Sequence, residues 1–364
     1  MDKSRVALAL ALLVACGHGN SQPRATKSPS STLSSPSVAD RLKVEPLASF
    51  ASGDPLIFNV TGWDHYIAWV ASDGRGSPPN RVVVYDLATR TKRIVARATT
   101  PVAVIDSVAG DRHTIVYSQE DHTPDDEAPN GLAVPWADYT VDLVTGKRQR
   151  ILSERNARPR DAVLPSPRIE WPWVLDVKQG RVPGPGVDVD VYDLRTGRVK
   201  TVLSQVRGGS GFDLDQRLIV YSATSRAGDD LFAVGVDGSG GPRQLTDSGQ
   251  VISNRTANGS TSWREPEMGL PQSLWWLPER EGAKPIRFSA GGYSPYPGRG
   301  FVAWSPVAGT ELLAQDPTQN TSPIMLASDS FDTEAFYAAF GDRVVWATRS
   351  SGSPTVHIAR IVIG

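Results

Sequence analysis

The sequence predicts an all-β protein, a seven-bladed β-propeller of four-stranded antiparallel blades. Two observations lead to this prediction: a short apolar tetrapeptide that ends in an aromatic residue recurs along the chain, and a hairpin motif follows most of its copies. The 33 Gly and 28 Pro among 364 residues supply the many turns that short strands need. This length suits a propeller folded as a single domain.

The tetrapeptide is predicted to be the second strand of each blade, with its aromatic residue packed between neighbouring sheets. The clear copies are YIAW (66–69), TIVY (114–117), LIVY (218–221), STSW (260–263), FVAW (301–304) and RVVW (343–346). A seventh marker, Trp173, is taken from WPWV (171–174), where Pro172 interrupts the strand and makes Trp171 an equally good choice. Successive markers are 41 to 56 residues apart, an interval typical of propeller blades.

A strand, tight turn and strand follow most markers and form the outer half of the blade. Alternating β-branched residues lead into Asp and then Thr-Gly or Asp-Gly, where Gly provides the positive φ of a hairpin turn. The segments are RVVVYDLATRTKRIV (81–95), DYTVDLVTGKRQRIL (138–152), VDVYDLRTGRVKTVL (189–203) and DLFAVGVDGSGGPRQLT (230–246). First strands precede the markers, as in PLIFNV (55–60), PVAVIDSV (101–108), AVLPSPRIE (162–170) and AFYAAF (335–340).

The ring is predicted to close through its two ends. The last unit contains RVVWATR (343–349) and VHIARIVIG (356–364) and is one strand short. LKVEPLASF (42–50), which precedes the first full unit, can supply that outermost strand. Pro46 is acceptable there because an outer strand has a free edge.

The N-terminus has the pattern of a secretory signal peptide, assigned to residues 1–15. Lys3 and Arg5 precede an apolar run (6–15) that is too short to span a bilayer as a helix. Residues 16–41 are rich in Ser and Pro and poor in large apolar side chains, which predicts a disordered tether. We therefore assign the propeller domain to residues 42–364.

Leu13-Val14-Ala15-Cys16 resembles the lipobox of bacterial lipoproteins, and Cys16 is the only cysteine. The resemblance implies that the Cys16 thiol carries the lipid, such as palmitate, and becomes the first residue of the mature chain. The alternative is an ordinary cysteine in a cleaved signal or a buried thiol. In either case no second thiol is present to form a disulfide.

The segment LFAVGVDGSGGPRQLT (231–246) resembles the blade motif of TolB-like and related WD-type periplasmic propellers. In that motif a strand enters an Asp-Gly turn and ends in Arg-x-Leu-Thr. The Ser-Pro-Asp-Gly turn that is frequent in the family is absent; Ala109-Gly110-Asp111 and Gly341-Asp342 occupy comparable places. The resemblance implies the propeller fold and does not extend to TolB's partners.

Candidate binding residues lie in the loops that join second to third strands and neighbouring blades, since these loops gather on one face of a propeller. The longest loop, 119–136, is acidic, and an arginine-rich segment, RNARPR (155–160), is expected on the same face. The acidic spacing matches no known metal loop, so a solvated acidic lid that faces these arginines is the alternative. The candidates are Asp121, His122, Asp125, Asp126, Glu127, Trp136, Arg155, Arg158 and Arg160.

Several classes of function lack support in the sequence. With 38 basic and 39 acidic side chains, no overall positive field exists to hold nucleic acid. The five histidines form no grouped zinc motif, no G-x-S-x-G elbow is present, and the Gly-rich runs lack a phosphate-binding Lys. We assign no catalytic residues, no metal ligands and no cofactor.

These features favour a lipid-anchored binding scaffold of the bacterial cell envelope, on the non-cytoplasmic side of a membrane. We expect a monomer that holds an envelope protein or glycan through its loop face. The alternative is an envelope enzyme of glycoside hydrolase, lyase or lactonase type, with its site at the loop face of the propeller channel.

Overall fold

Residues 40–364 form one compact unit in the computed structural model of the chain. The residues described are 42–74, 77–120, 135–154, 166–179, 186–208, 211–267, 270–280, 282–289, 291–306, 311–319, 321–328, 337–348 and 353–364. They contain no helix with the length and apolar character needed to cross a bilayer.

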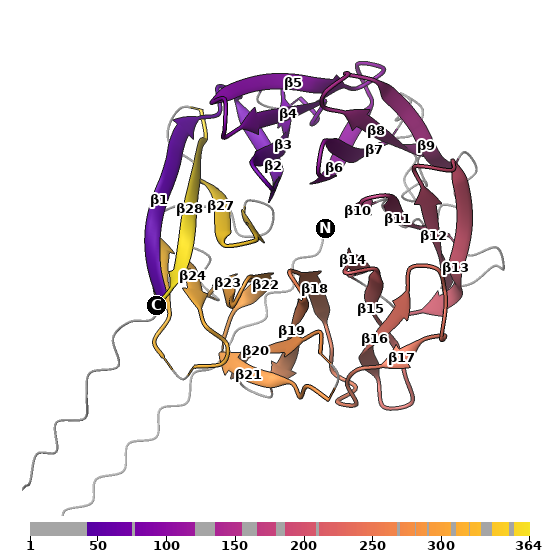
Figure 1. Cartoon of the computed structure of the whole chain (residues 1–364), viewed down its shortest axis with the longest axis vertical. Helices are drawn as coiled ribbons and strands as arrows, with labels where there is room; N and C mark the ends of the chain where they lie inside the picture. The colour runs from indigo at the N-terminus through magenta and orange to yellow at the C-terminus, as the bar shows by residue number, and fades with distance from the viewer. Residues whose placement is uncertain are drawn as a thin grey trace, which may run out of the picture. The chain divides into compact units, whose positions relative to one another are not determined.

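The described strands form seven four-stranded antiparallel sheets arranged around a ring, which confirms the predicted seven-bladed propeller (Figure 1). Each sheet runs from an innermost first strand to an outermost fourth strand, and we number the blades in chain order.

Blades 1 to 3 consist of β2 (Leu56–Trp63), β3 (Tyr66–Ser72), β4 (Arg81–Asp86) and β5 (Thr91–Arg97); β6 (Val104–Asp111), β7 (Thr114–Glu120), β8 (Trp136–Asp142) and β9 (Arg148–Glu154); and β10 (Arg168–Glu170), β11 (Trp173–Gln179), β12 (Gly186–Asp193) and β13 (Arg198–Arg207). Blades 4 to 6 consist of β14 (Asp213–Asp215), β15 (Leu218–Thr224), β16 (Asp229–Gly235) and β17 (Arg243–Gln244); β18 (Ser253–Ala257), β19 (Ser260–Glu267), β20 (Leu270–Pro278) and β21 (Ile286–Ser289); and β22 (Tyr293–Gly298), β23 (Phe301–Ser305), β24 (Leu312–Gln315) and β25 (Ile324–Ala327). Blade 7 consists of β26 (Tyr337–Phe340), β27 (Arg343–Thr348), β28 (Thr355–Ile363) and β1 (Leu42–Ala51).

Blade 7 is closed by the N-terminal strand, as predicted. β1 pairs antiparallel with β28, from Leu42 opposite Ile363 to Ala51 opposite Thr355. The register shifts between Pro46 and Ala48, where proline removes a donor that an outer strand does not need. This pairing joins the two ends of the described chain in one sheet (Figure 1).

The repeated aromatic residue packs between blades in six of the seven copies. These side chains are 0–7% exposed, and the apolar clusters around them join neighbouring sheets. Burying such large side chains in six blades stabilises the ring through contacts between successive blades. The six are Trp69, Tyr117, Tyr221, Trp263, Trp304 and Trp346.

In blade 3 the predicted marker is wrong, because an aspartate occupies the aromatic position. The Trp171-Pro172 pair forms the turn between β10 and β11, and Trp173 is the first residue of β11, opposite Glu170. In blade 1 the corresponding pair is Trp63 opposite Tyr66. Counting equally from these pairs places Asp176 where blade 1 has Trp69. Asp176 is 1% exposed, so the aromatic core of the other blades is replaced here by a buried carboxyl group.

Candidate binding site in the central channel

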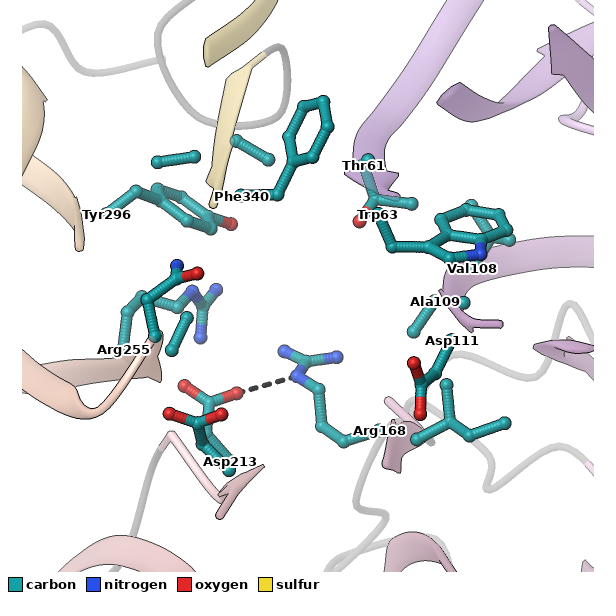
Figure 2. A pocket seen from close by; sticks show the side chains of 18 of the residues that line it. Thr61, Trp63, Val108, Ala109, Asp111, Arg168, Asp213, Arg255, Tyr296 and Phe340 are labelled. Carbon is teal, nitrogen blue, oxygen red and sulfur yellow. Dashed lines mark hydrogen bonds and ion pairs between the residues drawn. The ribbon is translucent and has the colours of Figure 1, made fainter. Parts of the chain in front are cut away.

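The innermost strands line a central cavity of about 820 Å³, a volume typical of small-molecule and peptide sites. The cavity extends from Pro79 and Ser166 to the turns between first and second strands, such as those at Asp111 and Gly341. Every blade contributes to its lining. Figure 2 shows side chains from several of these strands pointing into the space.

The turns between first and second strands hold the blades to one another by a hydrogen-bonded belt. Among the described residues each blade contributes one link to the next, so the belt runs around the whole ring. Such pairing fixes the spacing of the inner strands and therefore the shape of the cavity. The links are Trp63 Nε1 to Arg112 O (2.9 Å), Trp171 N to Asp111 Oδ2 (2.6 Å), Arg217 N to Glu170 Oε2 (2.8 Å), Gly259 N to Asp215 Oδ2 (2.6 Å), Asn258 Nδ2 to Pro297 O (3.0 Å), Arg299 N to Gly341 O (2.7 Å) and Arg343 Nη1 to Asp64 O.

The lining of the cavity is charged and on balance acidic. Seven carboxyl groups and four guanidinium groups line it, so the formal balance favours a ligand that brings positive charge. They are Asp64, Asp106, Asp111, Glu170, Asp213, Asp215 and Asp342, with Arg168, Arg255, Arg299 and Arg343.

Two arginines on one side of the cavity share a single carboxylate. Arg168 Nε donates to Asp213 Oδ1 at 2.6 Å, the contact drawn as a dashed line in Figure 2. The second oxygen, Asp213 Oδ2, accepts the backbone N–H of Thr256 at 2.9 Å. The charge of Asp213 also acts on Arg255, although no carboxylate among the described residues lies within ion-pair distance of that guanidinium. This group, which we call the Arg168–Asp213–Arg255 triad, carries one excess positive charge.

Tyr296 forms a platform beside the triad. The guanidinium carbon of Arg255 lies 5.4 Å from the centre of the Tyr296 ring, within the range of a cation–π contact. Figure 2 shows Arg255, Tyr296 and Arg168 pointing into the same part of the cavity. A guanidinium has five N–H donors in one plane, so those that the contacts with Tyr296 leave over can meet a planar anion.

Asp106 supplies a different chemistry elsewhere in the lining. Desolvation within the channel, followed by the charge of Glu120, raises the pKa of Asp106 to about 6, and its side chain is exposed to the cavity. A carboxyl group with such a pKa can both accept and release a proton near neutral pH, as a general base or acid requires.

Among the described residues no three His, Cys, Asp or Glu side chains are grouped so that they could hold a metal ion. The candidates Asp121, His122, Asp125, Asp126, Glu127, Arg155, Arg158 and Arg160 lie outside the described residues, as does Cys16. Trp136 is described: it is 6% exposed at the start of β8, opposite Glu120. The loop site remains a prediction.

The triad was missed in the sequence because its members lie in three different inner strands. Arg168 is in β10, Asp213 in β14 and Arg255 in β18. Arg168 and Asp213 are more than 40 residues apart in the sequence, and so are Asp213 and Arg255. Only the closure of the ring brings the three side chains together. The available signal was the presence of charged residues inside short first strands, where an apolar residue would face a core.

The comparisons with known proteins show a similarity of fold. The propeller domain of the Trilobed protease from Pyrococcus furiosus matches with a TM-score of 0.58 and 12% identity, over 83% of this chain and 94% of that one. Oligogalacturonate lyase from Vibrio parahaemolyticus matches with a TM-score of 0.54 and 13% identity, over 89% and 94%. No family model and no curated protein sequence matches the chain.

TolB from Acinetobacter baumannii is also among the structural neighbours. Its TM-score is 0.46 at 12% identity, over 83% of this chain and 78% of TolB. At this level of similarity the shared feature is the propeller, and nothing about partners follows from it.

Proposed function

We propose that this protein is a lipid-anchored binding scaffold of the bacterial cell envelope, which holds its partner in and around the propeller channel. The observation that carries the proposal is the Arg168–Asp213–Arg255 triad, an excess positive charge presented inside a cavity of about 820 Å³. A ring braced by the interblade belt can present these groups without rearrangement, which lowers the entropic cost of binding.

The anchor rests on the lipobox-like sequence that ends at Cys16 and on the Ser- and Pro-rich tether (16–41). A lipid on Cys16 would place the propeller on the non-cytoplasmic side of a membrane. Metabolic labelling with a fatty-acid probe should mark the wild type and not Cys16→Ser. Equal labelling of both proteins would refute the anchor.

Binding is tested by capture from solubilised envelopes with the full-length protein. Arg255→Gln removes the excess positive charge of the triad, and Asp125→Asn with Asp126→Asn neutralises part of the predicted loop site. A partner that is lost with one variant and kept with the other locates the binding surface. Identical capture by the wild type, both variants and a bare-resin control would contradict the scaffold.

The alternative is an envelope enzyme, and Asp106 is the observation that favours it. Its pKa of about 6 suits proton transfer, and the fold resembles that of an oligogalacturonate lyase. Turnover of a glycan or lactone by the wild type, abolished in Asp106→Asn and retained in Asp64→Asn, would establish this function instead.

A further inference from the structure

The channel combines one excess positive charge at the triad with an acidic lining elsewhere, and this combination restricts the ligand. Two guanidinium groups face one carboxylate at Asp213, whose two oxygens are already occupied by Arg168 and by the backbone of Thr256. Arg255 therefore has one shared, distant counter-charge, a long hydrogen bond from Nη1 to Asn254 O at 3.5 Å and a side-chain hydrogen bond to Tyr296. These contacts leave part of its five N–H donors for a ligand.

The geometry of Arg255 suits a carboxylate. A guanidinium presents paired N–H groups in one plane, which match the two oxygens of a carboxylate in a bidentate contact. The ring of Tyr296 supports the guanidinium from one side, and Figure 2 shows both groups directed into the cavity. A carboxylate here would gain contacts with Arg255 without displacing the Arg168–Asp213 pair.

The remaining lining argues against a polyanion. Six carboxyl groups besides Asp213 line the same cavity, against two guanidinium groups outside the triad. Of these two, Arg343 already donates to the backbone of Asp64. A ligand with many negative charges, such as an acidic polysaccharide, would meet like charge along most of the channel. A ligand with a single carboxylate and at least one cationic group would match both parts of the lining.

We propose that the channel binds a peptide by its free C-terminal carboxylate, held by Arg255 above Tyr296, with a basic side chain of the peptide directed at the acidic lining. This inference rests on the proposed scaffold function and names the chemistry of its ligand.

The test measures binding to the full-length protein in detergent by isothermal titration calorimetry. The probes are acetyl-Lys-Ala-Ala with a free carboxylate, the same peptide as its C-terminal amide, and trigalacturonate as the acidic glycan. We expect the free acid to bind at least tenfold more tightly than the amide. In Arg255→Gln this preference should vanish, whereas Arg299→Gln, a cavity-lining control outside the triad, should keep it.

Unchanged melting temperatures would show that Arg255→Gln acts on binding and not on folding. Equal affinity for the acid and amide peptides, or absence of binding by both, would overturn the inference. Tighter, Arg255-dependent binding of trigalacturonate would overturn it in favour of an acidic glycan. In each of these cases the capture experiment with envelope partners still decides the scaffold function independently.

Discussion

Asp138 of β8 and Asp176 of β11 meet across the interface between blades 2 and 3, where both side chains are buried, at 0% and 1% exposure. At the equivalent place between blades 1 and 2, Val82 and Tyr117 belong to one apolar cluster. Among the described residues, three of the four carboxyl oxygens of the aspartate pair have no hydrogen-bond partner outside the pair. Two carboxylates cannot both be charged at such a site, so the pair holds a proton between them.

This pair is expected to make stability depend on pH. Burial, followed by the charge of Asp176, raises the pKa of Asp138 well above 3.8, and burial raises that of Asp176 to about 6. The folded state therefore binds more protons than the unfolded state above pH 3.8, so the free energy of unfolding falls as the pH rises from there. Asp138→Asn should reduce this fall by about 1–2 kcal/mol, measured by urea unfolding at pH 5 and pH 8.

Asp188→Asn is the matched control for that measurement. Asp188 is equally buried, at 1% exposure, but accepts the backbone N–H of Gln205 at 3.0 Å. The proposal of a shared proton fails if Asp138→Asn and the wild type lose the same stability between the two pH values.

Asp54 joins the closing blade to blade 1 and is expected to be costly to remove. It is 6% exposed and accepts hydrogen bonds from Trp69 Nε1 at 2.9 Å and Arg81 Nη2 at 2.8 Å. Asp54→Ala leaves the buried Trp69 Nε1 without this acceptor and Arg81 with Asp73 as its remaining carboxylate partner, so we expect the free energy of unfolding to fall by about 2 kcal/mol. Denaturant unfolding measures it. A loss as small as that of Glu45→Ala, on the exposed rim of blade 7, would show that the contact contributes little.

Asn258 tests the interblade belt. Its side chain donates to Pro297 O at 3.0 Å and accepts from Gly341 N at 2.8 Å, and its φ is +56°. Asn258→Ala removes both bonds and strains the backbone, while Asn258→Gly removes the bonds and relieves the strain. We expect losses of about 2–3 kcal/mol for Ala and about 1–2 kcal/mol for Gly. A Gly variant as stable as the wild type would mean that the belt does not stabilise the ring.

Glu279, directly after β20, gives a second pH-dependent prediction. Burial, followed by the charges of Asp215 and Glu170, raises its pKa from 4.5 to about 8, and neither carboxyl oxygen has a hydrogen-bond partner within the described part of the chain. The wild type should lose stability as the pH rises from 4.5 to 8, because the unfolded chain ionises first. The free energy of unfolding of Glu279→Gln, taken relative to that of the wild type, should therefore be about 1–2 kcal/mol higher at pH 8 than at pH 5.

Chemical unfolding at the two pH values measures this gain. Glu265→Gln is the control, because Glu265 accepts hydrogen bonds from Trp263 and Ser248. A gain of the same size in Glu265→Gln would remove the special role of Glu279.

The propeller, its seven units and its closure by Leu42–Ala51 follow from sequence patterns alone. These features repeat along the chain, and each copy of the aromatic tetrapeptide or of the Asp-containing hairpin reports the same local strand and turn preferences. The same reasoning failed at Trp173, because this tryptophan begins β11 three residues before Asp176, and a carboxyl group at the position of the buried aromatic gives no repeat signal.

Only the tertiary structure decided which side chains meet. Arg168, Asp213 and Arg255 come from three blades, and Asp138 and Asp176 from two, so no local pattern links them. The physical reason is that strand propensity acts over a few residues, whereas the charges that face a channel or an interface are brought together by closure of the ring.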